Sequence, residues 1–275
     1  MTYKSLTEKP ASATFLFSIC TLVTNKEEYN IMKQSFEDCG FTDRCEYMIA
    51  DNSNGNKFDA YQAIRRFIAE AQGKYLVIVH QDVRCIDKID QLENCLDQLS
   101  AQDEKWAVAG NAGGIGYHQF AHYINNAGRI IKTTKLPARV SSLDENFLVI
   151  KKEASLTVSA DIKTFHLYGT DICIIADFLG HTSYVIPFMV KHLSLGNLKD
   201  LKKHVGEFVT SYGKKIRSRY METTCTKFYL SNSSFKNKVY NSSVIFFLVK
   251  FWQKIKLGFK RLSAPNPLKR TITNE

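Results

Sequence analysis

The chain has 275 residues, of which 44% are hydrophobic and 12% aromatic, and its net charge is +10. This length and apolar content exclude a disordered protein and indicate one domain with an appendage rather than two equal domains. Residues 1–197 carry 20 Lys and Arg against 23 Asp and Glu (−3), whereas residues 198–275 carry 17 against 4 (+13). We expect an N-terminal tail over 1–12, a domain over 13–197 and a basic, largely helical extension over 198–275.

From Phe15 onward, apolar runs alternate with segments of helical periodicity. Strands are predicted over 15–23, 46–50, 75–80 and 106–109, and helices over 27–38, 59–72 and 87–99. Such alternation predicts an α/β fold with a mostly parallel central sheet flanked by helices. Further along, the glycine-rich segment 110–116 is predicted as a loop, 148–150 and 183–187 as strands, and 171–178 as a helix capped by Thr170.

The N-terminal apolar run over 11–23 is interpreted as a buried first strand. A signal peptide is disfavoured because no small-residue cleavage site follows and a helix opens at Asn25 instead. The seven cysteines form no C-x-x-C pair and no zinc-type spacing, which suits a reducing cytosol. No run approaches the roughly 20 apolar residues of a transmembrane helix.

Two of the predicted strands end on polar motifs that contain a carboxylate. Asp51-Asn52-Ser53 follows the strand over 46–50, and His80-Gln81-Asp82 ends the strand over 75–80. The helix between them makes a strand-helix-strand crossover, which brings both strand ends to the same edge of the sheet. Open α/β sheets bind their ligands at that edge, so we expect Asp51 and Asp82 to belong to one site.

Five motifs, taken in order, resemble those of a known enzyme family. They are Asp51-Asn52-Ser53, the segment 73–83, Asp144-Glu145-Asn146-Phe147, Tyr168-Gly169-Thr170-Asp171 and His192. The series looks like the inverting nucleotide-sugar glycosyltransferases of the family 2 type, and within them the streptomycin-biosynthesis-type branch, where a His-Gln-Asp-Val string is familiar. The resemblance covers residues 13–197 and implies the GT-A (nucleotide-diphospho-sugar transferase) fold.

The resemblance also implies an activity. The expected reaction is hexosyl transfer with inversion from a nucleoside-diphosphate sugar to a glycan or lipid-linked acceptor, in bacterial cell-surface polysaccharide biosynthesis. The residues expected to bind the donor are Thr24, Asn25, Asp51, Asn52, His80 and Gln81.

A divalent metal, Mn²⁺ or Mg²⁺, is expected to neutralise the leaving diphosphate. The family's Asp-x-Asp motif matches His80 to Asp82, so Asp82 is the expected metal ligand, and the resemblance implies that His192 completes the ligation. His80 occupies the position of the first Asp of that motif, so the site has one negative charge fewer than the motif would provide.

An inverting transfer is a single displacement, so one general base must take the proton of the acceptor hydroxyl. The family's acidic pair at a helix start matches Thr170-Asp171, which makes Asp171 the expected base; Asp144 and Glu145 are the alternative pair. Structural interpretations stay open beside these roles, since Asp171 also suits a helix cap and Asp51-Asn52 an ordinary turn.

The extension ends in a predicted amphipathic helix over 244–262. The apolar arc consists of Val244, Leu248, Phe251, Trp252, Ile255, Phe259 and Leu262, with Lys250, Lys254 and Arg261 opposite. Such a helix suits an anionic membrane surface, so we expect a cytoplasmic protein held peripherally at the inner face of the cell membrane. Packing of this arc on the domain is the alternative. No nucleic-acid-reading motif accompanies the charge, and no nucleic acid partner is expected.

Two other functions stay open. A nucleotidyltransferase acting on a sugar phosphate would share the α/β fold and acidic metal ligands, although its glycine-rich, basic N-terminal signature is missing. A decayed transferase domain that serves as a membrane-binding module would account for His80 and Thr170 at positions where acidic residues are customary.

Overall fold

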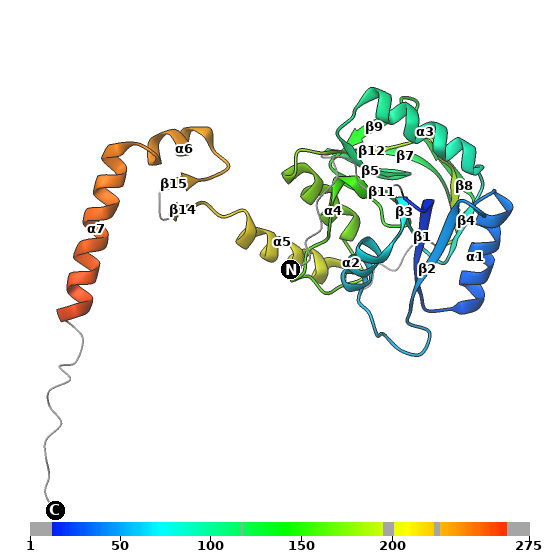
Figure 1. Ribbon diagram of the computed structural model, residues 1–275, viewed down its shortest axis with the longest axis horizontal. Coiled ribbons are helices and arrows are strands. Elements are labelled where there is room, and N and C mark those ends of the chain that lie inside the picture. The colour runs from blue at the N-terminus through cyan, green and yellow to red at the C-terminus, as the bar shows by residue number, and fades with distance from the viewer. Residues whose placement is uncertain (1–12, 117, 195–200, 223–225, 263–275) are drawn as a thin grey trace, which may run out of the picture. The chain divides into compact units, whose positions relative to one another are not determined.

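The computed structural model describes residues 13–116, 118–194, 201–222 and 226–262 (Figure 1). The chain forms two compact units, residues 1–208 and 209–275. The expected boundary after residue 197 falls outside the described residues and stays a prediction. Within the described residues, no helix combines the length and the apolar character needed to cross a membrane.

The first unit is built on a seven-stranded sheet with the order β2-β1-β3-β11-β5-β12-β9. Its strands are β1 Phe15–Val23, β2 Cys45–Asp51, β3 Gly73–Val79, β5 Trp106–Gly110, β9 Ala138–Val140, β11 Phe147–Lys151 and β12 Thr182–Val185. Three of the six neighbouring pairs are parallel and three are antiparallel, so the sheet is mixed and the prediction of a mostly parallel sheet is wrong. β11 runs against both neighbours because the chain reaches it through short strands and not through a helical crossover.

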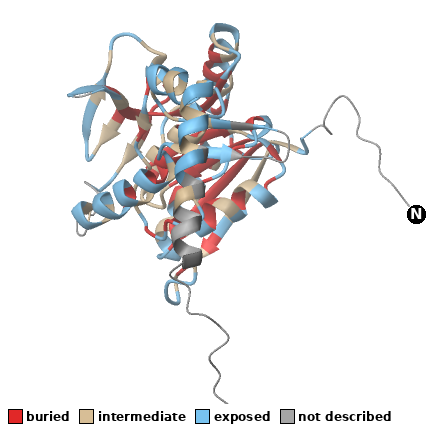
Figure 2. Cartoon of the chain, turned by 90° about the vertical axis from the view of Figure 1, so that its left-hand side faces the viewer, coloured by how far each residue is buried: buried red, intermediate tan, exposed pale blue. Residues whose placement is uncertain are grey.

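Helices cover both faces of this sheet. They are α1 Lys26–Asp38, α2 Ala60–Glu70, α3 Ile89–Gln102 and α4 Tyr168–Phe178, with a short 3₁₀ helix at Lys152–Ala154. Phe36 of α1 and Leu96 of α3 join Phe17 and Val77 of the sheet in one core cluster. Figure 2 shows the buried residues concentrated in the central strands. α2 and α4 pack on the other face, where the ring centroids of Tyr61 and Tyr168 lie 6.5 Å apart.

The predicted strands and helices up to residue 109 correspond to β1, α1, β2, α2, β3, α3 and β5 within a few residues. The loop predicted over 110–116 is wrong, because β5 ends at Gly110 and a strand, β6, occupies Ala112–Gly116. A Cβ on Gly113 would lie 2.3 Å from the carbonyl oxygen of Ser142, so this glycine permits the close approach of a strand. Thr170 does not cap α4, which begins after Leu167 at φ 67°.

A second sheet of the first unit has the order β10-β6-β7-β13-β4, with β8 paired to β7. Its strands are β4 Val83–Cys85, β6 Ala112–Gly116, β7 Gln119–Asn126, β8 Arg129–Lys132, β10 Ser142–Leu143 and β13 Val190–His192. β4 follows the carboxyl end of β3, and β6 follows that of β5, so the second sheet starts at the edge where ligand-binding residues were expected.

The second unit contains an antiparallel hairpin and two helices. Its elements are β14 Arg219–Glu222, β15 Lys227–Leu230, α6 Ser234–Tyr240 and α7 Ser243–Leu262, and α5 Leu201–Lys215 precedes them. The side chain of Asn241 fixes the hairpin, because its Oδ1 accepts from the Tyr229 N–H (2.6 Å) and its Nδ2 donates to the Tyr229 carbonyl (2.9 Å).

Candidate active site

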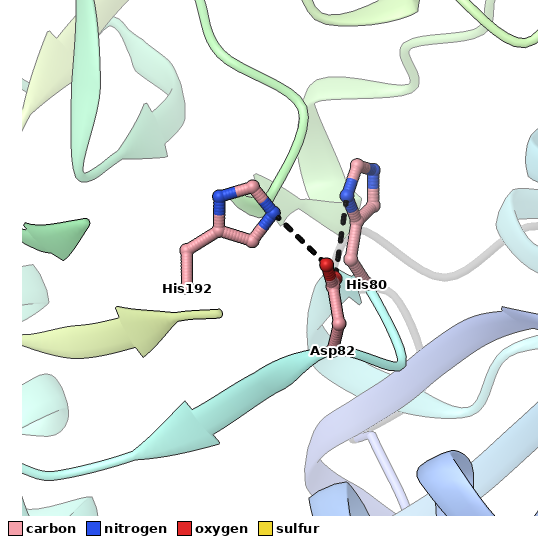
Figure 3. A group of neighbouring side chains, drawn as sticks. All are labelled: His80, Asp82 and His192. Atoms are coloured by element: carbon pink, nitrogen blue, oxygen red, sulfur yellow. Dashed lines mark ion pairs between the residues drawn. The ribbon is translucent and has the colours of Figure 1, made fainter. Parts of the chain in front are cut away.

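Three side chains able to bind a metal lie close together at the turn between β3 and β4. His80 and Asp82 lie in a tight turn closed by the Val83 N–H, which donates to the His80 carbonyl at 3.1 Å. The antiparallel pairing of β13 with β4 sets His192 opposite Val83. As a result, His192 Nε2 lies 3.4 Å from Asp82 Oδ2, and His80 Nδ1 lies 4.0 Å from Asp82 Oδ1 (Figure 3).

Tyr168 determines which nitrogen of His80 faces Asp82. The Tyr168 hydroxyl donates to the Glu145 carbonyl (3.2 Å) and lies 2.8 Å from His80 Nε2. With the hydroxyl proton donated to the carbonyl, the hydroxyl accepts from Nε2–H, and the lone pair of the neutral ring lies on Nδ1. Partial removal from water lowers the pKa of His80, although Asp82 favours the charged ring. The ring is therefore neutral, which is the form that binds metals.

The donor atoms of His80, Asp82 and His192 all lie within 4.8 Å of one another. Burial opposes the charge of Asp82, but hydrogen bonds from His192 and Ser194 hold its pKa well below its usual range. One carboxylate and two imidazoles form a donor set that fits a divalent transition metal. We call these three residues the triad.

Two cavities adjoin the triad. One, of about 530 Å³, is lined by His80 and His192 together with His122, Asp144 and Glu145. The other, of about 370 Å³, is lined by Thr24, Gln81, Asp82 and Tyr168, and it shares His80 and Phe165 with the first. The triad therefore lies between a cavity that reaches the end of β1 and a cavity that holds two predicted catalytic carboxylates.

Gln81 joins the ends of β1 and β3. Its Oε1 accepts from the backbone N–H groups of Thr24 (2.9 Å) and Asn25 (3.0 Å), and its Nε2 donates to Thr24 Oγ1 (2.8 Å). Asn25 Oδ1 in turn accepts from the N–H groups of Glu27 and Glu28 and caps α1. The structure thus brings Thr24, Asn25 and Gln81 together, with much of their hydrogen-bonding capacity used locally.

Asp51 and Asn52 lie at the end of β2, opposite the end of β1. Asp51 Oδ1 accepts from the N–H (2.9 Å) and hydroxyl (2.6 Å) of Ser53, and Oδ2 pairs with Lys26 at 3.1 Å. These contacts hold the pKa of Asp51 well below its usual range. Asn52 is buried, and its Oδ1 accepts from the backbone N–H groups of the following loop. Asn52 therefore organises the turn.

The predicted base Asp171 is fully buried. Its Oδ2 accepts from the Ser159 N–H at 2.7 Å and its Oδ1 from the Ser159 hydroxyl at 2.6 Å. It is not among the residues that line the 530 Å³ cavity, whereas its neighbour Thr170 is. The structure therefore does not bring Asp171 to the triad; its carboxylate ties α4 to the segment before it.

Asp144 and Glu145 both line the 530 Å³ cavity but have different surroundings. Glu145 accepts from the backbone N–H groups of Leu167, Tyr168 and Gly169 at the start of α4, where no side chain of the helix itself provides a cap. Burial raises the pKa of Glu145 to about 8, and the charge of Asp144 adds to this. Asp144 is exposed to the cavity. Of the three carboxylates, Asp144 is the one that an acceptor could reach.

The sequence prediction assigned His80 to the nucleotide sugar, and the structure puts it beside Asp82 and His192. The His-x-Asp spacing at a strand end is the signal that indicates such a pair. Tyr168 and His122 were not predicted as site residues. For Tyr168 the sequence offers its position next to the Gly169-Thr170-Asp171 motif, whereas nothing in the sequence singles out His122.

No family model matches this sequence. The chain is 35% identical over 189 residues to the protein named ATP synthase subunits region ORF 6 of Fuscovulum blasticum, covering 66% of this chain and 76% of that protein. The name of that relative gives no activity.

Many solved structures are similar to this one at a low level, and three serve as examples. They are S. aureus TarS 1-349 in complex with UDP-GlcNAc (10% identity, 71% of this chain and 67% of that one, TM-score 0.41), GalNAc-T7 with UDP, GalNAc and Mn²⁺ (9%, 75% and 58%, TM-score 0.43), and A197 from STIV (14%, 62% and 81%, TM-score 0.39). Similarity at this level says nothing about the activity of this chain.

Proposed function

We propose that this chain, which belongs to the same family as the ORF 6 protein of Fuscovulum blasticum, is an inverting glycosyltransferase that uses a nucleoside-diphosphate sugar. The observation that carries the proposal is the triad of His80, Asp82 and His192 between two cavities at the end of β3. The motif series that resembles family 2 glycosyltransferases supports the same activity.

A divalent cation would be held by His80 Nδ1, the Asp82 carboxylate and His192 Nε2. When bound, such a cation neutralises charge on a leaving diphosphate. Two imidazole ligands disfavour Mg²⁺, which prefers an all-oxygen shell, so of Mn²⁺ and Mg²⁺ we propose Mn²⁺. Tyr168 would keep the His80 ring turned with Nδ1 toward the cation.

The two cavities would divide the donor and the acceptor between them. The nucleotide would occupy the 370 Å³ cavity, toward Thr24, Asn25 and Asp51. Its diphosphate would lie at the cation site that includes Asp82. The transferred sugar and the acceptor would share the 530 Å³ cavity, where His122 and Asn126 offer polar groups beside apolar Ile124 and Ile131. A mixture of this kind suits the hydroxyls and the apolar ring faces of a sugar.

Asp144 is the general base of this proposal. Its carboxylate would take the proton of the acceptor hydroxyl while that oxygen attacks the anomeric carbon and the nucleoside diphosphate leaves from the opposite side. Glu145 and Asp171 would hold α4, which carries Tyr168, in position. The acceptor is proposed to be a glycan or a lipid-linked glycan of bacterial cell-surface polysaccharide, at the cytoplasmic face of the membrane.

The test is donor turnover across a panel of nucleotide sugars, together with calorimetric titration of UDP and GDP with and without Mn²⁺. We expect Mn²⁺-dependent nucleotide binding and turnover in the wild type, and a loss of at least about 100-fold in turnover for Asp82→Asn. Asp43→Asn, on an exposed surface loop, is the matched control and keeps both.

Two outcomes would contradict the proposal. Release of pyrophosphate from a nucleoside triphosphate and a sugar phosphate would indicate a nucleotidyltransferase. A folded protein that binds no nucleotide under any of these conditions would indicate a decayed transferase domain.

A further inference from the structure

One side of α7 carries a stripe of exposed apolar side chains. Val244, Phe247, Leu248, Phe251 and Trp252 are each 52–69% exposed. Separations of three and four residues put them on one face of the helix. We call these five residues the apolar stripe.

The opposite side of α7 already has partners within the second unit. The ring of Phe246 contacts that of Tyr220 at 6.0 Å, and Tyr220 contacts Tyr229 at 4.9 Å. Tyr229 also stacks on Tyr240 of α6 at 4.7 Å. This aromatic cluster packs on the side of α7 opposite the stripe, and the stripe residues keep more than half of their surface exposed.

The second unit, residues 209–275, is strongly basic. Its sequence contains 14 Lys and Arg against two Asp and Glu, a net charge of +12. On α6, Lys236 and Lys238 are exposed next to Phe235, whose side chain is 75% exposed.

An exposed apolar face together with an excess of positive charge favours one kind of binding partner for the stripe. A second copy of the same unit would bring a second net charge of +12 against the first, and like charges repel. An anionic lipid surface accepts both features, because apolar side chains enter the acyl boundary while lysines meet the headgroups. We infer that the second unit docks on an anionic lipid bilayer through the apolar stripe of α7 and Phe235 of α6. This inference goes beyond the proposed glycosyl transfer and does not depend on it.

The two tryptophans of the chain give a direct readout of docking. Trp106 is fully buried in β5, whereas Trp252 in the stripe is 59% exposed. When the full chain is titrated with vesicles containing a third phosphatidylglycerol in phosphatidylcholine, we expect co-sedimentation and a blue shift of the emission. Both weaken at high salt. Trp252→Phe loses the shift and keeps the sedimentation.

Matched variants separate the apolar from the electrostatic contribution. The double variant Phe247→Ser/Phe251→Ser is expected to bind these vesicles at least about tenfold more weakly. Phe178→Ser, in α4 of the first unit and 62% exposed, is the control and binds as the wild type does. Lys236→Gln and Lys238→Gln each weaken binding about fivefold, since a lysine near an anionic surface contributes about 1 kcal/mol.

Several results would overturn the inference. Equal binding to pure phosphatidylcholine would exclude the headgroup contribution, and unchanged binding of the Phe247/Phe251 variant would exclude the stripe. If the wild type ignores vesicles but is a dimer that this variant converts to monomer, the stripe is an interface between copies. Circular dichroism verifies that each variant folds. Donor turnover without vesicles is measured in parallel, because a failed glycosyl transfer would leave the vesicle result standing.

Discussion

Two polar clusters of the first unit lie at the ends of neighbouring strands, and they use their polar atoms differently. At the end of β1 and β2, the side chains of Asn25, Asp51 and Asn52 are bonded mainly to the backbone and to side chains nearby in the chain. At the end of β3, His80 and Asp82 face His192, which comes from a distant strand. The first cluster organises the turns at the rim, and the second holds three potential ligand atoms within 4.8 Å of one another.

The difference shows that polar residues at a strand end are not equivalent as ligands. A carboxylate saturated by its own turn, as Asp51 is by Ser53, has little left to offer a metal. A carboxylate whose neighbours are imidazoles can exchange those hydrogen bonds for coordination. The variants below test whether function follows the converging groups and stability follows the saturated ones.

The largest expected effect separates two carboxylates. Asp144→Asn should lower kcat about 100- to 10,000-fold while nucleotide binding persists, because a general base is removed from an open cavity. Asp171→Asn should instead lower the free energy of unfolding by about 2 kcal/mol, because a buried acceptor of two hydrogen bonds is altered. Steady-state kinetics and urea unfolding measure the two. A loss of kcat confined to Asp171→Asn would reverse the assignment.

The next effect concerns Tyr168. In Tyr168→Phe the His80 ring loses the partner of Nε2, and Mn²⁺ affinity should fall about tenfold. Isothermal titration with Mn²⁺ measures this. Tyr61→Phe is the matched control, because it removes a hydroxyl that donates to the His166 carbonyl (3.2 Å), outside the triad. Equal losses in both variants would show that the Tyr168 hydroxyl has only a packing role.

A smaller effect is expected for Gln81→Ala, which removes the hydrogen bonds joining the ends of β1 and β3. The free energy of unfolding should fall by about 1 kcal/mol, and the nucleotide Kd should rise several-fold because the rim loosens. Gln62→Ala, exposed on α2, serves as the reference. If nucleotide affinity collapses while stability stays unchanged, Gln81 contacts the ligand directly.

The effect on turnover is smallest for Glu145, where the expected change is a pH dependence of stability. Its pKa is raised from 4.5 to about 8, so the folded protein holds a proton that the unfolded chain releases. This contribution to stability is fully present below pH 4.5 and is lost as the pH rises toward 8. Gln cannot titrate, so the Tm of Glu145→Gln relative to wild type should rise between pH 5 and pH 8.5. A Tm difference that stays constant with pH would exclude the raised pKa.

The parts of the fold that local pattern determines could be predicted from the sequence. β1, α1, β2, α2 and β3 follow from apolar runs and helical spacing, which need no knowledge of the rest of the chain. The direction of β11 could not be predicted, because it depends on strands that intervene after β5. Glycines at 110–116 suit both a loop and a closely packed strand, and only the approach of β10 to Gly113 distinguishes them.

The candidate site can be divided in the same way, into features that follow from local sequence and features that depend on long-range packing. Motif order pointed to Asp82 and His192, and the structure brings them within 3.4 Å. Motif order could not indicate that Asp171 is buried or that Tyr168 orients His80, because both depend on how α4 packs against the end of β10 and the residues that follow it. Gly169 allows that packing, since a Cβ there would lie 2.3 Å from the Leu143 carbonyl oxygen.

The pairing of β13 with β4 also bears on the order in which the protein folds. His192 is 110 positions after Asp82 (192 − 82), so the triad forms only when a long loop closes. The entropy cost of closing that loop comes before a metal ion can bind all three side chains. A chain still in synthesis lacks the third ligand until almost the whole first unit has been made. Mn²⁺ that binds all three side chains would stabilise only the completed fold, so metal affinity would report on the integrity of the first unit as a whole.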